Sequence, residues 1–134
     1  MTKKLAFQVE LPDSYEIAVE KTIAALKIEG FGVLTRVDMK TTLKEKINVD
    51  FRPYVILGVC NPPLANQALQ GDPLVGLLLP CSATVEETEN GALISILNPE
   101  AVLMLSPLAD NSEVATVAKE ATKHLKRVAQ ALAA

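Results

Sequence analysis

The sequence predicts an α+β protein with an antiparallel sheet of about five strands and two long helices on one face of that sheet. Five segments have the composition of strands: residues 4–10, 31–37, 54–60, 81–88 and 92–97. Two longer segments, which begin near residues 13 and 110, repeat apolar residues with the period of an α-helix. No linker divides the 134 residues, so we expect one domain over residues 1–134, ordered β-α-β(4)-α with short helical insertions.

The first strand and the first helix are predicted from two different periodicities. Residues 4–10 alternate between apolar and polar side chains, as in a strand with one buried face. Asp13 and Glu16 resemble a capping box, and Gly30 is expected to end the helix that follows. The apolar stripe of this helix consists of Tyr15, Val19, Ile23 and Leu26.

A second strand and a short polar helix come next. After residues 31–37, Asp38 is in place to cap a helix over residues 39–47, with Leu43 and Ile47 on its inner side. Asn48 is expected to end this helix, because asparagine tolerates the left-handed conformation found at helix ends.

The third strand, residues 54–60, is apolar on both of its faces. If the two long helices cover one face of the sheet, something else must cover the other. The candidates are the segment of residues 98–110, the short helices, a partner subunit and a ligand. A homodimer is the simplest of these, and we expect one.

The second half of the chain predicts a hairpin and a closing helix. Asn61 can cap a short helix over residues 64–69, and an apolar, strand-like segment then ends at Pro80. Asn90-Gly91 predicts the turn of a hairpin. Residues 98–107 form a connecting arm, and the last helix buries a stripe of Val114, Val117, Ala121, Val128 and Leu132.

Composition narrows the classes of function. The net charge of -3 and the absence of clustered positive charge argue against a nucleic acid or an anionic membrane as partner. No apolar run approaches the roughly 20 residues of a membrane helix. A start at Met1-Thr2-Lys3-Lys4 without an apolar export segment, together with two cysteines, predicts a cytoplasmic protein.

Cys60 and Cys81 are the best local indication of chemistry, and they allow several interpretations. Both could be small buried side chains at strand ends, which we favour. Cys60 could instead be a reactive thiol beside a helix start, with Cys81 as its resolving partner. Two cysteines are too few for a structural zinc site, although a metal held across a dimer stays open.

Three further residues have a plain structural interpretation beside a functional one. Asn61 is more simply a helix cap, but it could present a small ligand together with Cys60. Arg52 belongs to a band of mixed charge, yet it could supply a fork for a carboxylate. His124, the only histidine, is expected to be an ordinary boundary residue of the last helix.

Several segments together resemble one known family. They are Phe31-Gly32-Val33-Leu34, Leu43-Lys44-Glu45-Lys46, the run from Tyr54 to Ala65, and Leu77-Leu78-Leu79-Pro80-Cys81. Over roughly residues 5–128 the chain is similar to the family called domain of unknown function 302. The resemblance implies a fold of the TATA-box-binding-protein-like class and no established activity, and it does not imply DNA binding. Asn48 stands where this family often has glycine.

These observations lead to one principal expectation and one alternative. The principal expectation is a small homodimeric binding module for a small molecule or a protein partner, with Cys60, Asn61, Cys81 and Arg52 as candidate ligand-binding residues. The alternative is a thiol-dependent enzyme or redox sensor that uses Cys60 and Cys81. The sequence contains no glycine-rich phosphate loop and no HExxH motif, so we assign no cofactor, metal or catalytic residue.

Overall fold

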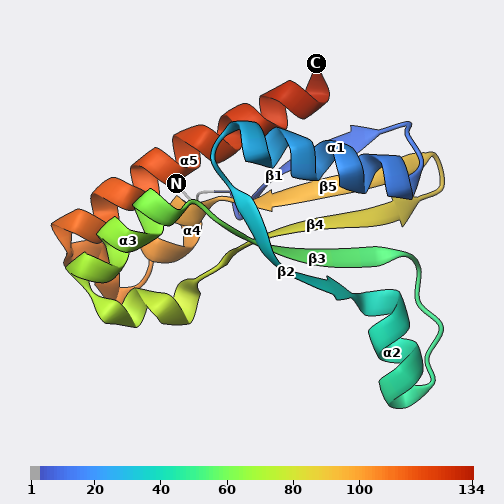
Figure 1. Ribbon diagram of the computed structural model, residues 1–134, viewed down its shortest axis with the longest axis horizontal. Coiled ribbons are helices and arrows are strands. Elements are labelled where there is room, and N and C mark those ends of the chain that lie inside the picture. Colours follow the sequence, from blue (N-terminus) through green and yellow to red (C-terminus); the bar gives the residue numbers. More distant parts are fainter. Residues whose placement is uncertain (1–3) are drawn as a thin grey trace.

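The computed structural model describes residues 4–134 and confirms the α+β class (Figure 1). Residues 1–3, which entered the argument about export, lie outside the described part. The elements are β1 (Ala6–Leu11), α1 (Tyr15–Ile28), β2 (Gly32–Asp38), α2 (Met39–Ile47), β3 (Tyr54–Cys60), α3 (Pro62–Gly71), the 3₁₀ helix η1 (Pro73–Leu78), β4 (Cys81–Thr88), β5 (Gly91–Leu97), α4 (Pro99–Leu103), the 3₁₀ helix η2 (Pro107–Asp110) and α5 (Ser112–Ala133).

The five strands form one antiparallel sheet in the order β1-β5-β4-β3-β2. Helices α1 and α5 lie on the same face of this sheet, as predicted (Figure 1). Side chains that alternate along the central strands point to these helices, so Val55, Leu57 and Val59 of β3 are buried. The helix side of the sheet is therefore the site of the main hydrophobic core.

Helix caps confirm most of the predicted boundaries. Asp38 accepts a hydrogen bond from the Thr41 N–H at 3.0 Å, and Asn48 has the left-handed conformation with φ of 55°. The start of α1 differs by one residue: Ser14, not Asp13, accepts a hydrogen bond from the Ile17 N–H. Asp13 instead pairs with Lys21 at 2.7 Å.

The expectation of a strand-like segment before Cys81 is wrong. Residues 73–78 form η1, because Asp72 accepts a hydrogen bond from the Leu74 N–H at 2.9 Å and Pro73 suits the first position of a helix. Cys81 therefore begins β4 instead of following a strand. The arm of residues 98–107 also folds, since its first part is α4, and α4 packs against α5.

The buried side chains form two hydrophobic clusters. The main cluster lies between the sheet and helices α1 and α5. A satellite cluster lies beyond the end of the sheet and consists of Ala68, Val75, Leu103, Val114, Val117 and Ala118. Helix α5 belongs to both, because its second half packs on the sheet and its first half packs on α3 and α4.

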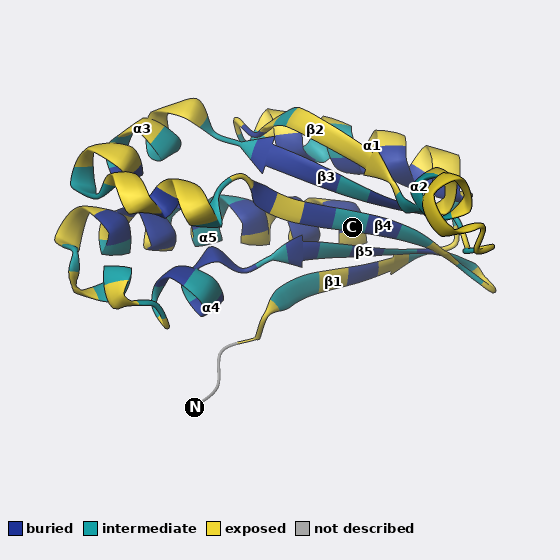
Figure 2. Ribbon diagram, turned by 90° about the horizontal axis from the view of Figure 1, so that it is seen from below, coloured by how far each residue is buried: buried dark blue, intermediate teal, exposed yellow. Residues whose placement is uncertain are grey.

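The second face of the sheet is not covered by a helix layer (Figure 2). Tyr54, Ile56 and Cys60 of β3 alternate with the buried residues and are half-buried on this open face. Of the candidates for its cover, residues 98–110 lie against α5, and α2 extends away from the sheet beyond β2 and β3 (Figure 1). Within residues 4–134 the open face thus remains without a covering element.

Candidate functional site

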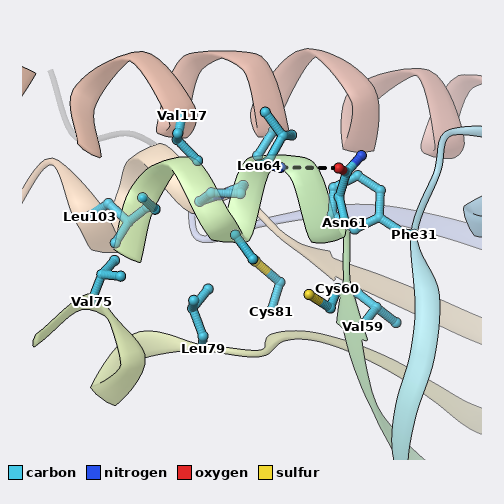
Figure 3. Close-up of a pocket in the computed structure, with 14 residues that line it drawn as sticks. Phe31, Val59, Cys60, Asn61, Leu64, Val75, Leu79, Cys81, Leu103 and Val117 are labelled. Carbon is cyan, nitrogen blue, oxygen red and sulfur yellow. Dashed lines mark hydrogen bonds between the residues drawn. The ribbon is translucent and has the colours of Figure 1, made fainter. Parts of the chain in front are cut away.

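A pocket lies at the seam between the two hydrophobic clusters. Its walls come from the ends of β3 and β4, from helices α3, α4 and α5, and from η1 (Figure 3). Phe31, Val59, Cys81 and Ala121 belong to the main cluster, whereas Ala68, Val75, Leu103 and Val117 belong to the satellite cluster. The cavity volume is about 30 Å³, which is room for about two water-sized molecules.

Both cysteines line this pocket. Val59 and Cys81 are register partners of β3 and β4, so Cys60 follows directly after the residue that faces Cys81. Both thiols are free, and the sulfur atoms lie on the same side of α3 in the close-up (Figure 3). Cys81 is buried and Cys60 is half-buried, so the two thiols differ in their access to solvent.

Burial makes both thiols weaker acids. Burial, together with the smaller effect of the charge of an ionised Cys60, raises the pKa of the Cys81 thiol to about 11. Burial also raises the pKa of Cys60. Because a nucleophilic cysteine needs a lowered pKa, the thiol-dependent enzyme or redox sensor is not favoured.

Asn61 acts as a helix cap and as a tie between two elements. Its Oδ1 accepts a hydrogen bond from the Leu64 N–H at 3.3 Å, which caps α3. Its Nδ2 donates to the Glu29 carbonyl at 3.4 Å, just after the end of α1. Both ends of the amide are therefore engaged at the rim of the pocket.

The structure brings three of the four candidate residues together, but not Arg52. Arg52 precedes β3, whereas Cys60 ends it. Its guanidinium donates to Glu86 Oε1 at 3.2 Å from Nε and 2.9 Å from Nη2, and it lies 4.5 Å from the centre of the Phe51 ring. The fork for a carboxylate exists, and Glu86 of the same chain occupies it.

Sequence reasoning missed the wall that α4 contributes. Asn98 caps α4 by accepting a hydrogen bond from the Glu100 N–H at 3.2 Å, and Pro99 follows as its first residue. The same Asn-Pro pair starts α3 at Asn61-Pro62. This repeated pair was the signal that could have predicted a helix, and with it the positions of Pro99 and Leu103 in the pocket.

The sequence also did not predict a charged cluster near the pocket. Glu29 Oε1 lies 2.8 Å from His124 Nδ1 and 3.0 Å from Arg127 Nε, which joins the end of α1 to α5. His124 packs edge-on against Phe31, a wall of the pocket, with 6.4 Å between ring centres. The hydrogen bonds of His124 and Arg127 to Glu29 hold the pKa of this carboxyl below its ordinary value.

The described residues narrow the chemistry that this site can perform. Among residues 4–134 there is no group of three or more His, Cys, Asp or Glu side chains that could hold a metal ion. In the same range every buried polar side-chain atom has a hydrogen-bond partner. No helix in this part of the chain is long and apolar enough to cross a membrane.

Comparisons with known proteins identify the family. A comparison with curated proteins found no match. The crystal structure of an uncharacterised conserved DUF302 protein from Bacillus stearothermophilus is similar, with 29% sequence identity and a TM-score of 0.84. The match covers 96% of this chain and 98% of the other. The likeness to the TATA-box-binding-protein-like class stays a prediction. The model of the family described as domain of unknown function DUF302 matches residues 7–132, and this chain therefore belongs to that family.

Proposed function

We propose that this chain is a binding module that takes a small, mostly apolar ligand in the seam pocket. One observation supports the proposal above all: Cys60 and Asn61, at the end of β3, line one cavity with Cys81, at the start of β4, between two hydrophobic clusters. Binding pockets are typically apolar cavities with a few polar groups at fixed positions. Here the polar groups are two thiols and one amide.

The lining favours shape and apolar contact over hydrogen bonding as the basis of recognition. The Asn61 amide already has partners at both ends, and the thiols are weak hydrogen-bond donors. A volume of about 30 Å³ fits only a few heavy atoms. A larger ligand would have to separate the satellite cluster from the main cluster.

The proposal includes self-association in a reducing cytoplasm. Two free thiols on neighbouring strands are compatible with that compartment, where disulfides are rare. The open face of the sheet supports a homodimer, because an apolar strand face without a cover is typical of an interaction surface.

The ligand proposal is tested with small apolar probes. Xenon and cyclopentane are titrated into 15N-labelled protein, and amide shifts are followed at Ala65, Ala68 and Val117. We expect saturable shifts at these residues and slower alkylation of Cys60, which half-faces solvent.

A matched pair of variants decides whether the shifts report the pocket. Ala65→Leu places a larger side chain in the cavity wall of α3, whereas Ala24→Leu makes the same change on the exposed side of α1. We expect Ala65→Leu to abolish the shifts and Ala24→Leu to preserve them. The proposal is wrong if neither probe shifts the pocket residues of the natural protein, or if Ala65→Leu leaves the shifts unchanged.

A further inference from the structure

Helix α2 differs from the other α-helices of residues 4–134 because it has no buried residue. Its ends are nevertheless well formed: Asp38 caps the start, Thr42 donates to the Asp38 carbonyl at 2.7 Å, and Asn48 closes the end. A helix of nine residues is below the roughly 12–15 residues at which isolated helices become marginally stable in water. Its local sequence therefore specifies a helix that the rest of the chain hardly supports.

The exposed side of α2 is apolar as well as basic. Ile47 is 63% exposed and Val49, just after the helix, is 42% exposed. Lys40, Lys44 and Lys46 outnumber the single acidic residue of the helix, Glu45. A helix with this combination is suited to a surface that is apolar and lacks positive charge.

Most of the open face of the sheet of the same chain is apolar or hydroxyl-bearing. The strand register places two rows of side chains across it: Val37, Ile56, Thr84, Ser95 and Gln8 in one row, and Tyr54, Glu86, Leu93 and Glu10 in the other. Hydroxyl and apolar groups dominate the first row, and the second row combines them with two carboxylates, Glu10 and Glu86. Glu86 pairs with Arg52, whose guanidinium also lies 5.7 Å from the centre of the Tyr54 ring, so one positive charge stands at that end of the face.

The two surfaces lie on the same side of the molecule. Helix α2 stands at one corner of the sheet, on the side away from α1 and α5 (Figure 1). Seen from that side, the strands lie open and α2 stands at their edge (Figure 2). A two-fold interface uses the same surface on both copies, so an axis through the open faces can bring each α2 beside the sheet of the other copy.

The available area fits a dimer of modest size. Five strands at a spacing of about 4.8 Å, with about six residues each at 3.3 Å, span roughly 500 Å². One side of a nine-residue helix adds about 100–150 Å². The total is near 600 Å² per copy, or about 1,200 Å² for the pair, which is the lower end of the range for specific interfaces.

We infer that two copies of this chain pack through their open sheet faces and that each α2 packs against the sheet of the other copy. This inference rests on the self-association proposed above and names the surface that performs it. It does not depend on a ligand in the seam pocket, which lies beyond the Cys60 end of β3, among α3, α4, α5 and η1.

Light scattering coupled to size exclusion, at protein concentrations from micromolar to millimolar, tests the assignment. We expect a dimer for the natural protein. Ile56→Glu, on the open face of β3, and Ile47→Glu, on α2, should each weaken the dimer Kd by at least about tenfold. Two exposed residues elsewhere provide matched controls, Leu77→Glu on η1 and Ile28→Glu at the end of α1, each at 82% exposure.

A second measurement separates assembly from folding. Ile47 is mostly exposed, so Ile47→Glu leaves the folded monomer intact even if Ile56→Glu disturbs β3. Hydrogen exchange should show protected amides in α2 of the dimer and fast exchange in the monomeric variant. A natural protein that stays monomeric at millimolar concentration overturns self-association itself. A dimer that survives both interface variants, or that only Leu77→Glu disrupts, overturns the surface assignment and leaves the pocket proposal untouched.

Discussion

The two ends of strand β3 lie in very different surroundings. At the Cys60 end, side chains from four helical segments close a second hydrophobic cluster around an apolar pocket. At the Tyr54 end, Arg52 pairs with Glu86 and packs on aromatic rings, and the preceding segment leaves the body of the protein as α2. One strand thus connects a place suited to enclose a small ligand with a place suited to meet another protein chain.

Apolar character alone does not reveal what a strand does. Both ends of β3 are rich in apolar residues, but the enclosing elements differ. Asn61 begins a capped helix directly after the strand, so the chain folds back over its own core. Residues 48–53 precede the strand without regular structure, and the main contacts of α2 are with β2 and β3.

The largest expected difference between the two ends is in core packing. Leu103→Ala removes a buried side chain of the satellite cluster and should lower the free energy of unfolding by about 2–4 kcal/mol. Leu43→Ala, in the half-buried stripe of α2, should cost less than about 1 kcal/mol. Urea denaturation at the lowest workable protein concentration measures both. Equal losses would show that α2 is as well integrated as the satellite cluster.

Gly58 lies between the two ends of β3 and leaves no room for a side chain. A Cβ there would collide with Thr35 Oγ1 and would lie 2.8 Å from Pro80 Cγ. Gly58→Ala should therefore destabilise the fold by about 1–3 kcal/mol. Gly32→Ala, on the edge strand β2, is the control because nothing lies within 4 Å of the added atom. A Gly58→Ala variant as stable as Gly32→Ala would mean that β2 moves aside freely.

Patterns local to the sequence predicted most of the fold, whereas the pocket needed long-range information. Periodicity and the Asn90-Gly91 turn predicted the strands, and Asp38 and Asn48 marked the bounds of α2. The segment before Pro80 was misjudged, because a short apolar run fits a strand and a 3₁₀ helix equally well. The meeting of Cys60 with Leu103 and Val117 depends on how α4 and α5 pack, which no local pattern specifies.

Capping residues give a smaller contrast between the two ends. Asn61→Ala removes the cap of α3 and the hydrogen bond to the Glu29 carbonyl, and we expect a loss of about 1 kcal/mol. Asp38→Ala removes an equivalent cap from the exposed α2 and should reduce global stability by only a few tenths of a kcal/mol. Chemical denaturation compares the two variants. A greater loss for Asp38→Ala would reverse the order of support that the structure assigns to α3 and α2.

The thiols at the Cys60 end should respond to alkaline pH in a fixed order. Cys60 reacts with iodoacetamide first because it is half-exposed, and Cys81 reacts appreciably only as the pH approaches its pKa of about 11. Stability linked to Cys81 is complete below pH 9.0, the ordinary thiol value, and is lost between pH 9.0 and about 11, where only the unfolded chain ionises readily. Mass spectrometry of singly alkylated peptides reads the order, and prior labelling of Cys81 in folded protein would contradict it.

The smallest expected effect is at acid pH, where Glu29 joins α1 to α5. Its pKa is lowered first by the hydrogen bond to His124 and then by Arg127. The stabilisation is complete above the ordinary pKa of a glutamate and is lost as the pH falls through the lower value of the folded state, because the unfolded chain binds the proton first. Glu29→Gln should flatten this part of the stability curve, whereas Glu20→Gln, on the exposed side of the same helix, should not.

His124 Nδ1 also lies 2.8 Å from Arg127 Nη2, and one nitrogen cannot donate to Glu29 and accept from Arg127 at once. Since His124 lowers the pKa of Glu29 more than Arg127 does, Arg127→Ala should retain part of the pH response that Glu29→Gln removes.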